Sequence, residues 1–182
     1  MRVYAKRYPL YAMLGVGMIV KEEELERIMS KEEVNKGKEY ALKLLEYRER
    51  SEQEIKDRMR RKGYENKVIA ETIEFLKNQN LVNDERFARM WTESRLRRSY
   101  GRWKISSDLK EKGVDRELID EVLKELYSGI NETQIALELV ERKWPSLEKG
   151  DNLMLRRISS FLKRRGFSFE VIADVMNQIT ES

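Results

Sequence analysis

The chain has 182 residues, of which 40% are hydrophobic and 38% charged, so it can bury a core beneath a densely ionic surface. It contains no cysteine and no histidine, which excludes disulfides and thiolate metal sites and removes the commonest general base. The 37 Lys and Arg residues barely exceed the 33 Asp and Glu residues. The net charge of +4 therefore does not establish a nucleic-acid partner, and the placement of the cations must decide.

The first element in chain order is an irregular head, residues 1–20, with a basic start and an apolar continuation. This order is shared with the beginning of a secretory signal, but no small-x-small cleavage site precedes Lys21. The apolar stretch is also too short to span a bilayer. We interpret the head as a short strand pair or a segment that caps the core, and we expect a cytoplasmic protein with no membrane partner.

Helical patterning begins near Glu22 and continues almost to the end of the chain. A Ser-x-x-Glu capping box at Ser30 predicts the start of a first main helix, after a lead-in helix. A second capping box at Ser51 predicts a short helix that ends at Gly63 in the left-handed conformation. A third apolar stripe continues to Leu76. These three helices form one predicted unit.

The same pattern recurs twice, at a spacing of about 50 residues. The segment from Ile55 aligns without gaps with segments that start at Ile105 and Ile158. The equivalent glycines are Gly63, Gly113 and Gly166. Such a period predicts an all-α tandem array in which each unit stacks on its neighbours, giving an elongated, curved molecule. The predicted division is a head and lead-in helix over 1–35, followed by three-helix repeats over 36–82, 83–129 and 130–182.

The sequence offers little for chemistry. Gly15 and Gly17 lack the third glycine of a nucleotide-binding loop, and no catalytic or metal-binding motif is evident. We therefore predict no catalytic residue, no cofactor, no metal and no enzyme activity.

Cations gather in the second unit, interleaved with the aromatic residues Tyr100 and Trp103. Between residues 86 and 104 there is one acid, Glu93, and the following cations: Arg86, Arg89, Arg95, Arg97, Arg98, Arg102 and Lys104. Because the cluster spans a helix, a break and the next helix start, the helix dipole does not account for it. Arginine binds phosphates in a bidentate manner, so the cluster predicts a ligand surface.

Two smaller clusters occupy matching places in the first and third repeats, each in the last turn of a short helix. Their members are Arg58, Arg61 and Lys62, and Lys163, Arg164 and Arg165. Cations at a helix C-terminus complement its dipole without any ligand. A structural role and a binding role therefore both stay open for these clusters.

One segment is specific enough to indicate a family. It reads Leu81-Val82-Asn83-Asp84-Glu85-Arg86-Phe87-Ala88-x-x-Trp91, followed by Arg95, Gly101, Ile105, Leu109 and Lys112-Gly113. This segment resembles the signature of the RecX family of bacterial recombination regulators, and the resemblance covers about residues 36–182. It implies a helical protein that lies in the groove of the RecA filament, restrains ATP hydrolysis and strand exchange, contacts DNA, and has no catalytic residue.

Two other functions fit the pattern. The last two helices of each unit have the spacing of a helix-turn-helix, which favours an independent, sequence-tolerant module that binds single- or double-stranded DNA. A generic helical scaffold for another protein is the third interpretation. We expect a monomer in each case.

Overall fold

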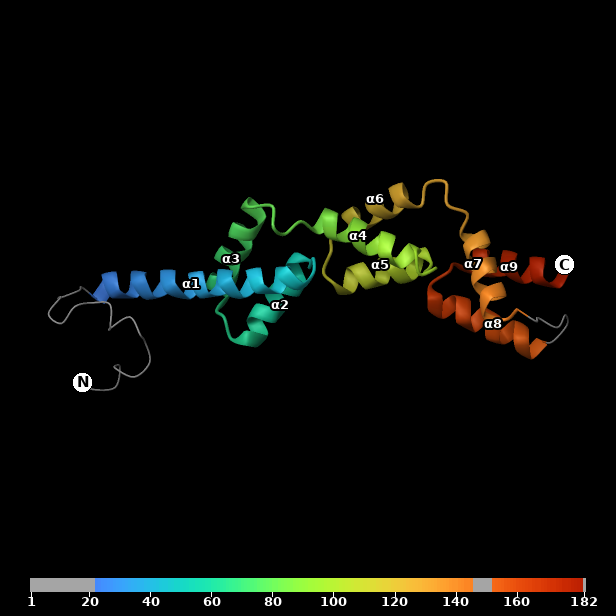
Figure 1. The fold of residues 1–182 in the computed structure, drawn as a ribbon, viewed down its shortest axis with the longest axis horizontal. Coiled ribbons are helices and arrows are strands. Elements are labelled where there is room, and N and C mark those ends of the chain that lie inside the picture. The colour runs from blue at the N-terminus through green and yellow to red at the C-terminus, as the bar shows by residue number, and fades with distance from the viewer. Residues whose placement is uncertain (1–21, 146–151, 182) are drawn as a thin grey trace.

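The computed structural model describes residues 22–145 and 152–181, which fold entirely into helices and the turns between them (Figure 1). The helices are α1 (Glu22–Tyr47), α2 (Glu52–Lys62), α3 (Asn66–Asn78), α4 (Asp84–Leu96), α5 (Arg102–Glu111), α6 (Arg116–Leu126), α7 (Glu132–Lys143), α8 (Asn152–Arg165) and α9 (Phe169–Glu181). The predicted strand pair of the head lies outside the described residues. No helix in the described part combines the length and apolarity needed to cross a bilayer.

Each set of three consecutive helices encloses its own hydrophobic core. Ile55 and Met59 anchor the first core, Ile105 and Leu109 the second, and Ile158 and Leu162 the third, all fully buried. We call α1–α3, α4–α6 and α7–α9 the first, second and third domains. The predicted all-α array of three-helix repeats is confirmed, whereas the residue boundaries given for the repeats stay predictions.

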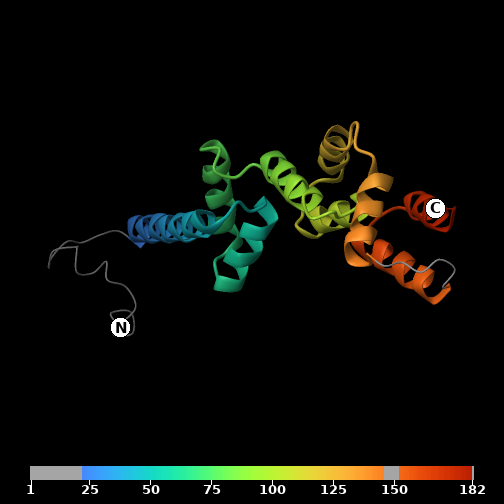
Figure 2. The same ribbon diagram turned by 45° about the vertical axis from the view of Figure 1, so that its right-hand side comes forward.

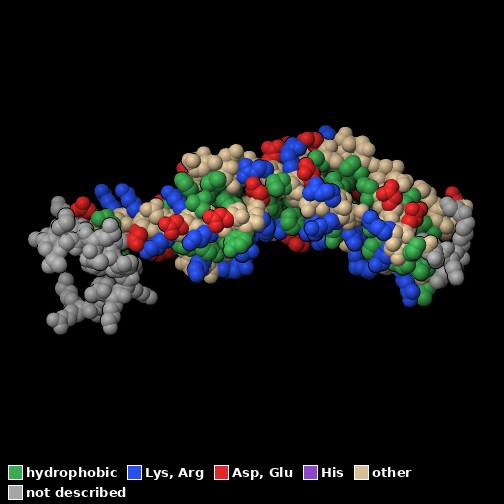
Figure 3. Space-filling model, viewed as in Figure 1, with side chains coloured by type: hydrophobic (Ala, Val, Ile, Leu, Met, Phe, Trp, Pro, Cys, Tyr) green, Lys and Arg blue, Asp and Glu red, His purple; other side chains and the backbone are tan. Residues whose placement is uncertain are grey.

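The domains follow one another in a row, with α1 at one end and α8 and α9 at the other (Figures 1 and 2). The space-filling view shows an elongated body whose lower edge is concave, as the repeat pattern predicted (Figure 3).

Local signals set most helix ends. The side chains of Ser51, Asn83, Asp115 and Asn131 each accept a hydrogen bond from the backbone of the first turn that follows. The helices α2, α5 and α8, which are the middle helices of the three domains, end at the three equivalent glycines, whose φ angles are +93°, +74° and +83°. The left-handed conformation predicted at Gly63 is therefore confirmed.

The helix start predicted at Ser30 is wrong. Ser30 lies inside α1, which runs without a break for 26 residues. A capping box requires a non-helical residue at its first position, but the eight preceding residues are already helical. Glu22, Glu23 and Glu24 occupy the first turn of α1, where negative charge complements the helix dipole.

The domains meet through the ends of their middle helices, α2, α5 and α8. At the first junction, the hydroxyl of Ser51 before α2 donates to the carbonyl of Lys112 after α5, at 2.5 Å. At the second junction, the N–H groups of Gly101 and Trp103 at the start of α5 donate to the carbonyls of Arg165 and Gly166 at the end of α8, at 2.9 and 3.0 Å. Groups that a helix leaves unpaired in its last turn thus find donors in the neighbouring domain.

Ion pairs support the first junction. Glu54 on α2 accepts hydrogen bonds from Arg48 at 2.9 Å and from Lys112 of the second domain at 3.1 Å. Asp84, the first residue of α4, accepts from the backbone N–H of Glu52 at 2.8 Å. Burial raises the pKa of Glu54, yet the hydrogen bonds from Arg48 and Lys112 outweigh it and lower the pKa to about 2.

The equivalent glycines differ in what surrounds them. A Cβ atom at Gly113 would collide with the side chain of Gln53, and one at Gly166 would collide with the backbone of Lys104. A Cβ atom at Gly63 would meet nothing within 4 Å. A substitution at Gly63 therefore tests the effect of backbone conformation alone, whereas a substitution at either of the other two glycines also disturbs a domain junction.

We expect alanine substitution to destabilise the protein least at Gly63, more at Gly113 and most at Gly166. Gly63→Ala should cost about 1–2 kcal/mol, the penalty for a side chain in the left-handed region. Gly166→Ala should cost clearly more, because a backbone must also move. Urea unfolding of the three variants measures the order, and equal losses would show that the junctions are not tightly packed.

The Glu54 contacts should weaken in acid. A carboxylate whose folded pKa is depressed stabilises the protein above its ordinary pKa of 4.5, and this contribution disappears as the pH falls from about 4.5 towards 2. Glu54→Gln should therefore lower the melting temperature at pH 7 but have little effect near pH 2. A constant difference across this range in thermal unfolding would contradict the ion-pair assignment.

Candidate nucleic-acid interface

The structure divides the central cationic cluster into engaged and free members. Arg86 pairs with Glu49 of the first domain at 2.9 Å and also donates to the carbonyls of Asn80 and Leu81. Arg89 pairs with Glu125 of α6 at 2.6 Å. Both acids lie more than thirty positions away in the sequence, so the sequence did not reveal these pairs.

Arg95 and Lys104 converge on Asp108 of α5, which is 7% exposed. Lys104 lies 2.7 Å from one carboxylate oxygen. Arg95 lies 3.4 Å from the other, close enough for charge attraction but not aligned for a hydrogen bond. The Arg95 guanidinium also lies 4.5 Å from the ring of Trp91 and 5.1 Å from that of Tyr100. Trp91 and Tyr100 thus belong to the interior of the second domain, as expected for Trp91.

Four of the seven cations thus have partners within the protein. Arg86, Arg89, Arg95 and Lys104 are held by acids of the protein itself. Their charges are partly neutralised, by carboxylates from elsewhere in the fold for Arg86, Arg89 and Arg95, and by a carboxylate one turn along the same helix for Lys104. A binding role for these four stays a prediction.

The other three cations differ among themselves. Arg97 and Arg98 are exposed in the turn after α4, and neither forms an ion pair with another described residue. Arg102, in the first turn of α5, is half-buried, and its backbone N–H donates to the carboxylate of Glu132 at 3.4 Å. Arg102 lies 5.9 Å from the ring of Tyr127. The neighbouring Trp103 is 70% exposed, so its ring is open to a ligand.

The two smaller clusters contain both kinds of cation. Arg61 donates to the carbonyl of Asp57 on its own helix, while Lys62 is exposed and Arg58 half-buried. Arg165 donates to the carbonyl of Arg98 at 2.9 Å and lies between the rings of Tyr100 and Phe161, so it closes the second junction. Lys163 and Arg164 are exposed. Cations with structural contacts and exposed cations therefore occur side by side.

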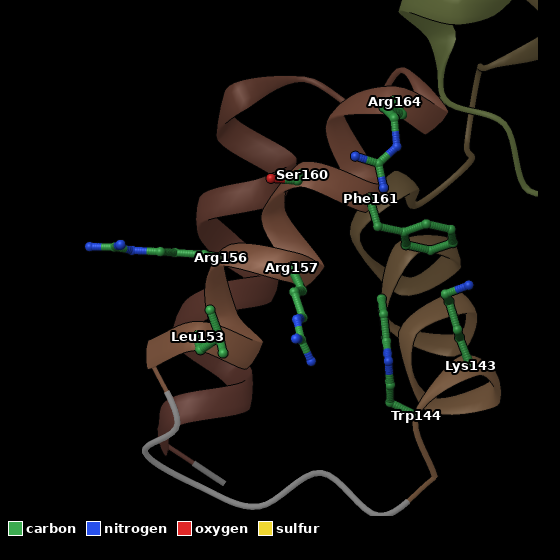
Figure 4. Close-up of a pocket in the computed structure, with 8 residues that line it drawn as sticks. All are labelled: Lys143, Trp144, Leu153, Arg156, Arg157, Ser160, Phe161 and Arg164. Atoms are coloured by element: carbon green, nitrogen blue, oxygen red, sulfur yellow. The ribbon is translucent and has the colours of Figure 1, made fainter.

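Sequence reasoning missed a further group of cations in the third domain. Lys143, Arg156 and Arg157 line a hollow of about 370 Å³ together with Arg164, Trp144 and Phe161 (Figure 4). A signal was present in α8, where residues 153, 156, 157, 160 and 164 share one face at helical spacing. The contribution of α7 becomes evident only when its end packs beside α8.

Lysine and arginine side chains also gather along the concave lower edge of the molecule, below α2, near the middle and below α8 (Figure 3). An edge of this kind carries positive potential over several domains. It suits a long polyanion better than a small molecule.

Small helical domains joined end to end, with cations along one edge, define a tandem helical-repeat protein, a class whose members typically present extended surfaces. Comparison with models of protein families identifies this protein more closely. The first three-helix domain of RecX matches residues 38–76, the second matches 83–123 and the third matches 131–176. The chain belongs to the RecX family.

Curated relatives agree over most of the chain. The regulatory protein RecX of Clostridium perfringens (strain SM101 / Type A) is 32% identical over 167 residues, which cover 90% of this chain and 78% of the relative. The regulatory protein RecX of Caldanaerobacter subterraneus subsp. tengcongensis is 27% identical over 92% of this chain and 83% of the relative. These relatives are named regulatory proteins rather than enzymes.

Solved structures show the same fold. The crystal structure of RecX from Lactobacillus salivarius has a TM-score of 0.70 at 22% identity, covering 84% of this chain and 99% of that one. A second crystal structure, of a regulatory protein RecX, has a TM-score of 0.73 at 19% identity and covers 92% of this chain and 83% of that one.

The division between engaged and free cations can be tested by stability. Arg95→Ala should destabilise the protein by about 1–3 kcal/mol, because the nearly buried Asp108 loses one of its two cations and two rings lose their stacking partner. Arg98→Ala should change stability by less than about 0.5 kcal/mol. Urea unfolding compares them, and a neutral Arg95→Ala would mean that this arginine is free for a ligand.

Proposed function

We propose that this protein regulates recombination by binding the RecA–DNA filament in its helical groove and restraining ATP hydrolysis and strand exchange. Membership of the RecX family is the observation that carries the proposal. The partner is the recombinase filament, and the protein acts in the cytoplasm as a monomer. It performs no catalysis of its own.

The proposed mechanism is competition for space. An elongated row of three domains can lie along a groove and contact successive protomers, whereas a compact domain would contact few of them (Figure 1). A bound row would obstruct the second DNA duplex and the protomer movements that accompany turnover. Because each domain has its own core, the row can bend at the junctions to follow the groove.

The proposed contacts follow the charge. Arg97 and Arg98 lie near the middle of the row and form no ion pair with another described residue, so they are our first choice for contact with phosphates, with Arg102 beside them. Lys62, Lys163 and Arg164 extend the surface into the outer domains. Phosphate contacts carry no base preference, so DNA contact should be sequence-tolerant.

A second candidate function is DNA binding without a recombinase. The exposed ring of Trp103 beside Arg102 favours it, because aromatic and cationic side chains together bind single strands. A plain protein scaffold has no specific observation in its favour.

The filament proposal predicts that the protein slows ATP hydrolysis by RecA on single-stranded DNA. Arg97→Glu with Arg98→Glu should lose most of this inhibition, because like charge would face the filament phosphates. The matched control, Arg116→Glu with Lys124→Glu, makes the same change of charge on exposed residues of α6 and should retain inhibition. No inhibition by the wild-type protein at micromolar excess would refute the proposal, and equal losses in both variants would refute the assigned surface.

A further inference from the structure

We propose that the hollow between the end of α7 and the face of α8 binds one nucleotide of a single-stranded nucleic acid, with cations holding its phosphate and Trp144 contacting its base. The site belongs to the third domain alone. It rests on the second candidate function, DNA binding without a recombinase, and deepens it by assigning a place for one phosphate and one base.

The hollow has an aromatic wall. Trp144 follows the last residue of α7 and meets Phe161 of α8 edge to face, with ring centroids 5.3 Å apart and an interplanar angle of 85°. Lys143 lies 4.7 Å from the Phe161 ring centroid and 5.3 Å from that of Trp144. The two rings thus hold each other in place, so the wall is rigid before any ligand arrives.

Cations face the same space. Figure 4 shows the Arg157 side chain directed into the gap beside Trp144, and the Arg164 side chain directed towards Phe161. The Arg156 side chain, one residue before Arg157, points away from the gap. This arrangement puts the guanidinium groups of Arg157 and Arg164 at the aromatic wall. Arg156 lies close by but points elsewhere, so it can serve as a control for Arg157.

No acid among the described residues balances the charge of the hollow. Within 22–145 and 152–181, no acid lies within 4 Å of Lys143, Arg157 or Arg164, and no acid lines the hollow. The helix dipole accounts for Arg164 in the last turn of α8, but not for Arg157, which lies in the middle of that helix. Positive charge without a structural role indicates an anionic ligand.

The combination of groups identifies the ligand class. Guanidinium groups bind phosphate through paired hydrogen bonds, and an aromatic wall offers a surface for a base, so together they fit a nucleotide. An acidic peptide would use the cations but not the wall. A duplex keeps its bases stacked inside, whereas a single strand can place one base in a hollow of about 370 Å³. A single strand is therefore the best fit.

The test uses the full-length protein and a fluorescein-labelled oligothymidylate in low salt, with no recombinase present. Arg157→Gln should weaken binding and reduce the slope of log affinity against log salt by about 0.7, the value for one lost contact to a single strand. Arg156→Gln removes the same charge one residue away and should change the affinity less. Equal losses in the two variants would refute the site, since they would show that the strand is attracted only by the overall positive charge of α8.

Tryptophan fluorescence tests the wall separately. Binding of the unlabelled strand should quench emission in the Trp103→Phe variant, which keeps Trp144, and quench it much less in the double variant Trp103→Phe with Trp144→Phe. Circular dichroism confirms that each variant is folded. Quenching retained in the double variant, tighter binding of polyglutamate than of the strand, or equal Arg157-dependent binding of a duplex would each refute the proposal. Because RecA is absent, failure here leaves the filament proposal standing, and failure of ATPase inhibition leaves this site standing.

Discussion

The structure depends on contacts between the ends of the middle helices, α2, α5 and α8. Carbonyl groups in the last turn of a helix have no partner within that helix. Here they accept hydrogen bonds from donors at the start of the middle helix of the preceding domain. The approach is so close that Gly113 and Gly166 have no room for a Cβ atom. Each glycine therefore serves twice, since it ends its own helix and admits the neighbouring domain. Gly63 has no neighbour and performs only the first role.

This junction explains why three small cores form one molecule. A unit of about 45 residues buries too little apolar surface to be strongly stable alone. Hydrogen bonds and ion pairs across the junctions, such as those of Ser51 and Glu54, add stability without merging the cores. The result is a row that is held at defined points and can bend between them, as the proposed binding along a helical groove requires.

The charged surface combines engaged and exposed cations for a similar reason. Arg95 and Arg98 are three residues apart, yet one is held between rings beside Asp108 and the other is exposed. Arg165 closes a junction while Arg164 beside it faces the hollow. Clusters of this kind cannot be interpreted as wholly structural or wholly functional. What separates the members is whether the fold brings a carboxylate, a carbonyl or a ring to each one.

The sequence by itself determined the helical class, the threefold repeat, the left-handed glycines and the family, because these depend on local spacing and on signals within one repeat. It misplaced the start of the first main helix, because a capping pattern does not show whether the chain before it is already helical. Only the tertiary structure decided that Arg86, Arg89 and Arg95 are engaged, since Glu49, Glu125 and Asp108 reach them from other parts of the fold. The hollow at Trp144 likewise required two helices to pack together, and no periodicity within one helix records how it meets the next.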